Sequence, residues 1–196
     1  MKKIPTVFVK DYDEGGRYLG IKRVVTPGCE WVLKGEGEAT EKVDGAACAI
    51  INGRFYRRYT VRAGQKRLAD GAVPCGDGPD PYTGKWPHWL PVSPFRHADK
   101  WFIKALENTP WYTEDGTYEA VGPHFQANPY GLDEDVLEKH GRIKMPDFPR
   151  TFDGMRDYLA AHEIEGVVFW KDGEPKCKIR RKDFGLRWPV GVDDDE

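Results

Sequence analysis

The sequence predicts an α+β fold in which mixed or largely antiparallel sheets pack against a few helices. Two turn signals support this prediction, because Asn52-Gly53 and Asp172-Gly173 each separate two strand-like runs, and such dipeptides favour tight hairpins. The third observation is the helical spacing of apolar residues over Thr151–His162, which predicts a helix. With 196 residues, of which 39% are hydrophobic, the chain is long enough to bury a core.

The first hairpin is expected to join strands at Ala46–Ile51 and Arg54–Arg62. In the second strand, the period of two puts three arginines on one face. Guanidinium donors match phosphate oxygens, so this row suits a phosphate-binding face. It equally suits a solvated strand face. The residues that share this face are Arg54, Tyr56, Arg58, Thr60 and Arg62.

The second hairpin is expected to join a buried strand at Gly166–Trp170 to a return strand at Lys176–Arg181. The return strand has an apolar face and a cationic face. This pattern is typical of a strand that forms the floor of a charged pocket, and also of any half-exposed strand. Cys177 and Ile179 face one way, and Lys176, Lys178 and Arg180 face the other.

One domain is expected over residues 1–190, with a Gly- and Pro-rich, loop-rich insertion at about 71–94 and an acidic tail at 191–196. The net charge of −2 does not predict a broadly basic nucleic-acid-binding chain, but it leaves room for a local basic face. No apolar run approaches the roughly 18 residues of a membrane span, so no membrane partner is expected. Four cysteines without a CxxC pair or an export signal predict reduced thiols in the cytoplasm. The histidines lack metal-ligand spacing.

Five short blocks carry the candidate chemistry. Each is weak alone, but their order and spacing resemble the nucleotidyltransferase motifs of ATP-dependent ligases and mRNA capping enzymes. In that superfamily a KxDG block holds a nucleotidyl-lysine, and an arginine, a glutamate strand, EGxV and KxK follow. The corresponding blocks here are Lys42–Gly45, the strand with Arg58, Tyr118–Gly122 with Glu119, Glu165–Val168 and Lys176–Lys178.

A closer resemblance is to the small 5′-to-3′ RNA ligase family of vertebrates and some viruses. Similar blocks occur there in the same order as TEKVDG at 40–45, PHWLPV at 87–92, NPYG at 128–131 and GLRWP at 185–189. The resemblance implies an adenylylation (nucleotidyltransferase) domain. Only eighteen residues follow Lys178, whereas an OB fold needs on the order of 70, so no OB domain is expected.

The resemblance also implies roles for individual residues. Lys42 is expected to attack the α-phosphate of ATP and form lysyl-AMP, and Lys176 and Lys178 are expected to assist this catalysis by holding the phosphate. Mg²⁺ or Mn²⁺ is expected to bind, through water, to Asp44, Glu119 and Glu165. Phe125, His140 and Phe148 lie where the family has its adenine-stacking residue, although packing roles suit all three. The expected nucleotide-binding set is Glu41, Lys42, Asp44, Gly45, Arg58, Arg62, Glu119, Glu165, Lys176 and Lys178.

The expected function is ATP-dependent joining of RNA 5′-phosphate and 3′-hydroxyl ends through lysyl-AMP and an RNA-adenylate. A ligase for nicks in DNA or DNA–RNA hybrids would use the same chemistry. A non-catalytic module that binds nucleotide or RNA is a different class of alternative, and AMP transfer to a protein is a further one. The sequence identifies no partner that prepares the RNA ends.

Overall fold

The computed structural model describes residues 3–62, 68–76, 78–79, 84–109 and 114–190, and their contacts divide into two compact units. The central unit is built mainly from Asp44–His140, and the terminal unit from Ile4–Val43 together with the chain from Gly141 onward. The single domain expected over 1–190 is thus made of two units, which are described separately. The expected acidic tail at 191–196 lies outside the described residues.

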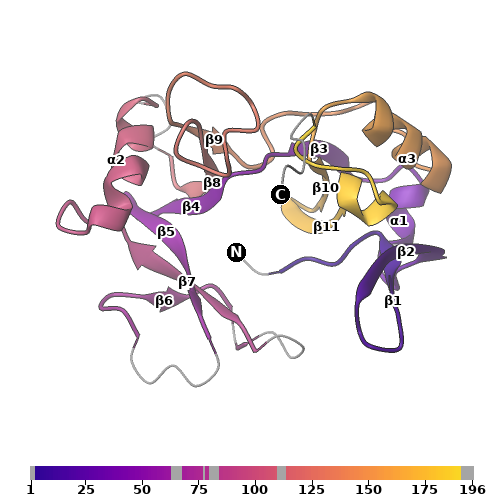
Figure 1. Ribbon diagram of the computed structural model, residues 1–196, viewed down its shortest axis with the longest axis horizontal. Helices are drawn as coiled ribbons and strands as arrows, with labels where there is room; N and C mark the ends of the chain where they lie inside the picture. Colours follow the sequence, from indigo (N-terminus) through magenta and orange to yellow (C-terminus); the bar gives the residue numbers. More distant parts are fainter. Residues whose placement is uncertain (1–2, 63–67, 77, 80–83, 110–113, 191–196) are drawn as a thin grey trace. The chain divides into compact units, whose positions relative to one another are not determined.

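The central unit contains an antiparallel sheet of six strands with α2 (Lys100–Glu107) against one face (Figure 1). The buried cluster under this helix includes Cys48, Ile50, Tyr118 and Leu137. The opposite face carries the alternate residues of the same strands, among them Glu119. The strand order is β6 (Val73–Pro74), β7 (Trp86–Pro91), β5 (Arg54–Val61), β4 (Ala46–Ile51), β8 (Gly116–Val121) and β9 (Val136–Lys139).

The first predicted hairpin is confirmed. Strands β4 and β5 pair antiparallel, and both Asn52 and Gly53 have positive φ, as a tight hairpin turn requires. The segment 71–94, expected to be rich in loops, contains β6 and β7. Two prolines in β7 lack a backbone N–H group, which makes such a segment look unlike a strand in the sequence. Pro87 and Pro91 are nevertheless accommodated opposite Thr60 and Tyr56 of β5.

The terminal unit contains a three-stranded antiparallel sheet and a separate two-stranded hairpin. Helix α3 begins after Thr151, whose Oγ1 accepts a hydrogen bond from the N–H of Gly154 at 3.1 Å, the usual role of an N-cap threonine. The sheet order is β11 (Glu174–Arg180), β10 (Gly166–Lys171) and β3 (Glu38–Lys42). The hairpin consists of β1 (Phe8–Tyr12) and β2 (Tyr18–Val25). The helices are α1 (Glu30–Leu33), α3 (Phe152–Ala161) and the 3-10 turn η2 (Arg181–Phe184).

The register of the terminal sheet separates an apolar face from a charged face. Val167, Phe169, Cys177 and Ile179 are fully buried in one cluster with residues of α1 and α3. The alternate positions point the other way: Lys42 and Arg180 lie on either side of Gly166, and Lys178 lies opposite Val168. The second predicted hairpin and the predicted helix are therefore confirmed, and the fold is mixed α+β with mostly antiparallel sheets.

Within the described part of the chain, no helix has both the length and the apolar character needed to cross a membrane.

Candidate functional site

Lys42 is the last residue of β3, and its amino group forms an ion pair with the carboxylate of Glu165, which immediately precedes β10. The pairing follows from the sheet, because Lys42 lies opposite Gly166 in the antiparallel register. Only 22% of the Lys42 side chain and 11% of the Glu165 side chain are exposed. Two blocks separated by more than a hundred residues thus meet at one lysine, whose amino group has a defined position.

Gly166 permits the close approach of the strands at this point. A Cβ atom at this residue would lie 2.2 Å from the backbone oxygen of Ile179 and 2.8 Å from the Cα of Arg180. Both atoms belong to the backbone of β11, so they cannot move aside without displacing the strand. The glycine of the EGVV block therefore has a steric role beside Lys42.

Lys178 and Arg180 project from the same face of the terminal sheet as Lys42. Burial, followed by the positive charges of Arg180 and Lys42, lowers the pKa of Lys178 to about 8, although Glu165 and Asp183 act in the opposite direction. A cation in this position is stabilised by any anion that arrives. The three cations Lys42, Lys178 and Arg180 therefore form a candidate phosphate site. We call these three residues, together with Glu165, the lysine site.

Asp183 holds Arg180 in place within this cluster. The fully buried carboxylate accepts hydrogen bonds from Nη2 of Arg180 at 2.6 Å and from the Arg180 backbone N–H at 2.9 Å. It also accepts one from the hydroxyl of Tyr18 at 2.9 Å, and burial together with Asp183 raises the pKa of that hydroxyl. The guanidinium is thus preorganised by a network that reaches hairpin β1–β2. In the sequence, Arg180 was placed only on the cationic face, and its buried partner was not foreseen.

The two other terminal-unit residues of the expected nucleotide-binding set lie farther from this centre. Lys176 is 40% exposed and pairs with Glu174 two residues before it on the same strand. Glu41 precedes Lys42, and successive strand residues point to opposite faces. The Glu41 side chain accordingly points away from the lysine site and lines a pocket.

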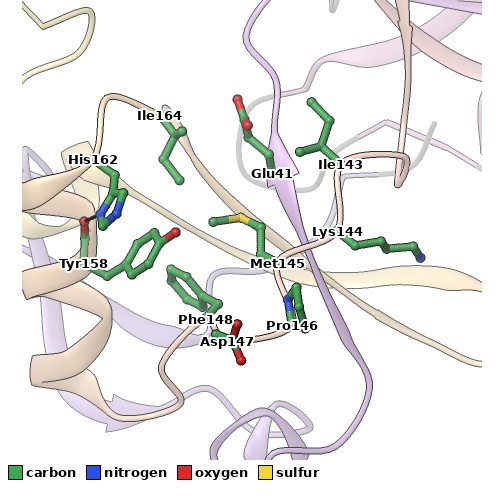
Figure 2. Close-up of a pocket in the computed structure, with 10 residues that line it drawn as sticks. All are labelled: Glu41, Ile143, Lys144, Met145, Pro146, Asp147, Phe148, Tyr158, His162 and Ile164. Atoms are coloured by element: carbon green, nitrogen blue, oxygen red, sulfur yellow. Dashed lines mark hydrogen bonds between the residues drawn. The ribbon is translucent and has the colours of Figure 1, made fainter.

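That pocket has a volume of about 330 Å³ and is formed entirely within the terminal unit. Figure 2 shows the Tyr158 and His162 side chains of the α3 region on one side of it, Ile143 and Lys144 on the other, and Met145 and Glu41 between them. The rings of Tyr158 and His162 stack with centroids 3.8 Å apart. Nothing in the sequence pattern indicated this pocket. Phe148, one of the candidate adenine-stacking residues, lines it and is also buried against Phe169 in the core.

The central unit carries a second group of the expected residues on the sheet face opposite α2. Ala47 of β4 lies opposite Glu119, and Ala49 lies opposite Tyr56. Alternation along β5 then places Arg58 on this same face, where it is exposed. Ala47 and Ala49, the small residues between Glu119 and β5, are both buried. Arg62 follows the end of β5 and is also exposed.

Glu119 is nine-tenths buried and takes part in a hydrogen-bonded chain. Its Oε1 lies 3.1 Å from Nε2 of His140, whose Nδ1 lies 2.8 Å from Oγ1 of Thr117. Its other oxygen, Oε2, is buried and has no hydrogen-bond partner among the described residues. His140, a candidate for adenine stacking in the sequence, is therefore engaged edge-on with a carboxylate. Phe125, the remaining stacking candidate, packs against Phe102 in the core.

Asp44 and Gly45 begin the central unit and are held by Tyr130 of the NPYG block and by Gln126 just before that block. The backbone N–H of Asp44 donates to the hydroxyl of Tyr130 at 2.6 Å, and Gln126 donates to the carbonyl of Gly45 at 3.3 Å. A Cβ on Gly45 would lie 2.3 Å from the Ala120 carbonyl oxygen, so this position also requires glycine. The loop that supplies these contacts has three consecutive non-glycine residues at positive φ, 126–128, which is a strained conformation. The sequence indicated only a turn here.

A scan against protein-family models gives no match to this chain, and a search of curated proteins gives none either. Among the described residues, no group of three or more His, Cys, Asp or Glu side chains is arranged to hold a metal ion.

Proposed function

We propose that this protein is an ATP-dependent RNA ligase whose chain forms an adenylylation domain of the covalent nucleotidyltransferase type. The observation that carries the proposal is the lysine site. There, Lys42 of the KVDG block is ion-paired to Glu165 of the EGVV block beside Lys178 of the KCK block. Three blocks that are scattered through the sequence converge around one amino group with the cations that an α-phosphate needs.

The proposed reaction has three steps. In the first, the uncharged amine of Lys42 attacks the α-phosphorus of ATP. An N–P bond forms, the P–O bond to pyrophosphate breaks with its electron pair leaving on pyrophosphate, and the nitrogen loses a proton to solvent. In the second, a 5′-phosphate oxygen of RNA attacks the same phosphorus. The N–P bond breaks with its electron pair on nitrogen, and the nitrogen takes up a proton from solvent, which regenerates the lysine. In the third, an RNA 3′-hydroxyl attacks the 5′-phosphorus, gives up its proton, and releases AMP.

The cations of the lysine site are suited to the first step. Negative charge develops on the α-phosphate oxygens as the phosphorus is attacked, and positioned cations stabilise that charge. Lys178 gains from such an anion, because burial and two neighbouring cations disfavour its charge when it has no anionic partner. Arg180 is already oriented by Asp183, and Lys176 lies at the exposed end of the same strand face.

The central-unit residues fit the later roles in the proposal. Arg58 and Arg62 are exposed guanidinium groups that suit the 5′-phosphate of RNA or the nucleotide phosphates. The buried Oε2 of Glu119 has no hydrogen-bond partner in the described part of the chain, so it suits an O–H donor such as a water on a metal ion. Asp44, Glu119 and Glu165 are the carboxylates proposed to hold Mg²⁺ or Mn²⁺ through water. When bound, the ion would supply positive charge against the phosphate oxygens.

Intact mass spectrometry after incubation with ATP and Mg²⁺ tests the first step. We expect the wild-type chain to gain one AMP, about 329 Da, on its lysine nucleophile. Lys42→Ala should gain nothing. Lys144→Ala is the matched control, because Lys144 is an exposed, ion-paired lysine of the same unit, and this variant should be labelled as fully as wild type.

Two results would contradict the proposal. Labelling of a folded Lys42→Ala protein would show that another residue is the nucleophile. A folded, nucleotide-free wild-type protein that gains no mass would exclude the nucleotidyltransferase reaction. If labelling succeeds, a panel of 5′-phosphorylated RNA, nicked DNA and DNA–RNA hybrids decides the acceptor, and we expect sealing of RNA ends to be the fastest.

A further inference from the structure

Only one oxygen of the buried Glu119 carboxylate has a hydrogen-bond partner among the described residues. In folded proteins, nearly all buried polar atoms have a hydrogen-bond partner, because a buried acceptor that has lost its water is costly. Oε1 of Glu119 has such a partner in His140, but Oε2 has none among the described residues. The asymmetry points to a donor supplied from outside the chain.

His140 determines which oxygen stays available. A carboxylate offers only acceptor lone pairs, so Nε2 of His140 carries the proton of their 3.1 Å hydrogen bond. In a neutral ring, Nδ1 is then an acceptor, and the Thr117 hydroxyl donates to it at 2.8 Å. Thr117 thus fixes the tautomer and orientation of the ring, much as outer partners orient the ligands of a metal site.

Strand pairing makes this arrangement rigid. His140 follows β9, and its backbone N–H donates to the Thr117 carbonyl at 3.0 Å, while Thr117 and Glu119 are alternate residues of β8. Only 15% of the His140 side chain and 11% of the Glu119 side chain are exposed, so neither side chain has room to reorient. Ala47, whose side chain is a single methyl group, lies opposite Glu119 on the same face.

We propose that His140 is a positioning residue that holds Glu119 so that Oε2 accepts a hydrogen bond from an O–H donor of the bound nucleotide. The inference rests on the proposed function. The donor is either a ribose hydroxyl or a water on the nucleotide's magnesium ion. Both offer the same chemistry to the carboxylate, and the experiment below has a separate arm for each.

The test measures equilibrium binding to the full chain carrying Lys42→Ala, which cannot form the covalent bond. Calorimetry compares ATP with 2′-deoxy-ATP and 3′-deoxy-ATP, and compares ATP with and without Mg²⁺. A hydrogen bond to a charged acceptor is worth about tenfold in affinity or more. We expect the affinity for ATP to fall about tenfold in one arm, either when a ribose hydroxyl is missing or when Mg²⁺ is left out. When His140→Asn is added to the chain, we expect this difference in affinity to shrink to less than about threefold.

Two further variants separate positioning from general stability. His140→Gln places an amide nitrogen near the position of Nε2 and should preserve the selectivity, whereas the shorter Asn side chain reaches only toward Thr117. His162→Asn alters a histidine of the other unit and should leave the selectivity unchanged. Thermal unfolding of each variant confirms that the chain is folded.

The possible failures are distinguishable. In one case, the His140→Asn chain still loses affinity fully when the hydroxyl or Mg²⁺ is missing, and wild type still gains AMP. The positioning role proposed for His140 is then wrong, and the proposed function stands. The role is equally wrong if His140→Gln loses the selectivity as fully as His140→Asn. If the Lys42→Ala chain binds no ATP and wild type gains no AMP, both proposals are overturned.

Discussion

Lys178 keeps a charged amino group partly buried beside two other cations, and this arrangement should reduce stability at neutral pH. A pKa of about 8 instead of 10.5 corresponds to a cost of up to about 3 kcal/mol. Because the folded pKa is the lower one, the cost is complete below pH 8. It disappears as the pH rises toward 10.5, where the unfolded chain also loses the proton.

The variant Lys178→Met should therefore raise the melting temperature by several degrees at pH 7, with little gain at pH 10. The same substitution should slow lysyl-AMP formation, since the α-phosphate loses a cation. Differential scanning calorimetry at both pH values is the measurement. Lys176→Met is the control, because this exposed lysine should change stability by less than about 0.5 kcal/mol at either pH. A loss of stability in Lys178→Met at pH 7 would contradict the argument.

For single residues, the sequence predicted those that belong to a recognisable motif. It missed those whose role depends on contacts with other elements. Lys42, Glu165 and Lys178 were expected, and the structure brings them together. His140 and Tyr130 were not expected in their present contacts. Their partners lie on other elements, so only the folded chain reveals a histidine aimed at a carboxylate or a tyrosine that holds a backbone N–H.

Among the elements, strand β10 depends most on one small residue. Gly166→Ala should push β11 away, because the added Cβ would overlap the backbone oxygen of Ile179 and the Cα of Arg180. Overpacking of this kind costs about 1–3 kcal/mol, and the displaced strand should also separate Lys178 and Arg180 from Lys42. Urea unfolding and adenylylation should therefore both report a loss.

Gly15→Ala provides the comparison in the same unit. Its added Cβ would meet only the Asp13 carboxylate, at an ordinary contact distance of 3.4 Å, so both measurements should stay near wild type. Equal behaviour of the two variants would show that the close approach at Gly166 does not matter.

Elements with local signals were the ones that the sequence predicted well. Asn-Gly and Asp-Gly determine hairpins through backbone conformations that only a few residues adopt easily, and both turns have positive φ at the two central positions. Strand β7 has no such signal and contains two prolines. It becomes a strand because β5 and β6 pair with it on either side, which is a tertiary effect.

In the whole molecule, the chain leaves the terminal unit after Val43 and returns at Gly141. The departing and returning segments are antiparallel neighbours: Glu41 donates its N–H to the Ile143 carbonyl, and Met145 donates to the Ala39 carbonyl, both at 2.9 Å. In chain order, residues 44–140 are therefore inserted where a hairpin turn would join these two neighbouring segments.

Replacement of residues 44–140 by Asn-Gly should leave a terminal unit that folds by itself. We expect cooperative thermal unfolding and a circular dichroism spectrum with strand and helix content. A matched deletion of 44–145 also removes the neighbour of β3 and should be less stable. An unfolded 44–140 deletion would show that the terminal unit needs the central one to fold.

The pairing of Lys42 with Glu165 also has a consequence for synthesis on the ribosome. The two residues are 123 positions apart, and β10 and β11 are translated only after all the strands of the central unit. The whole central unit is synthesised before β10 and can form its sheet by then, because domains fold as units during translation. A nascent chain that has not yet reached Gly166 carries Lys42 on a strand without its neighbour β10. Lys42 therefore acquires its carboxylate partner and its neighbouring cations only after the whole central unit has been translated.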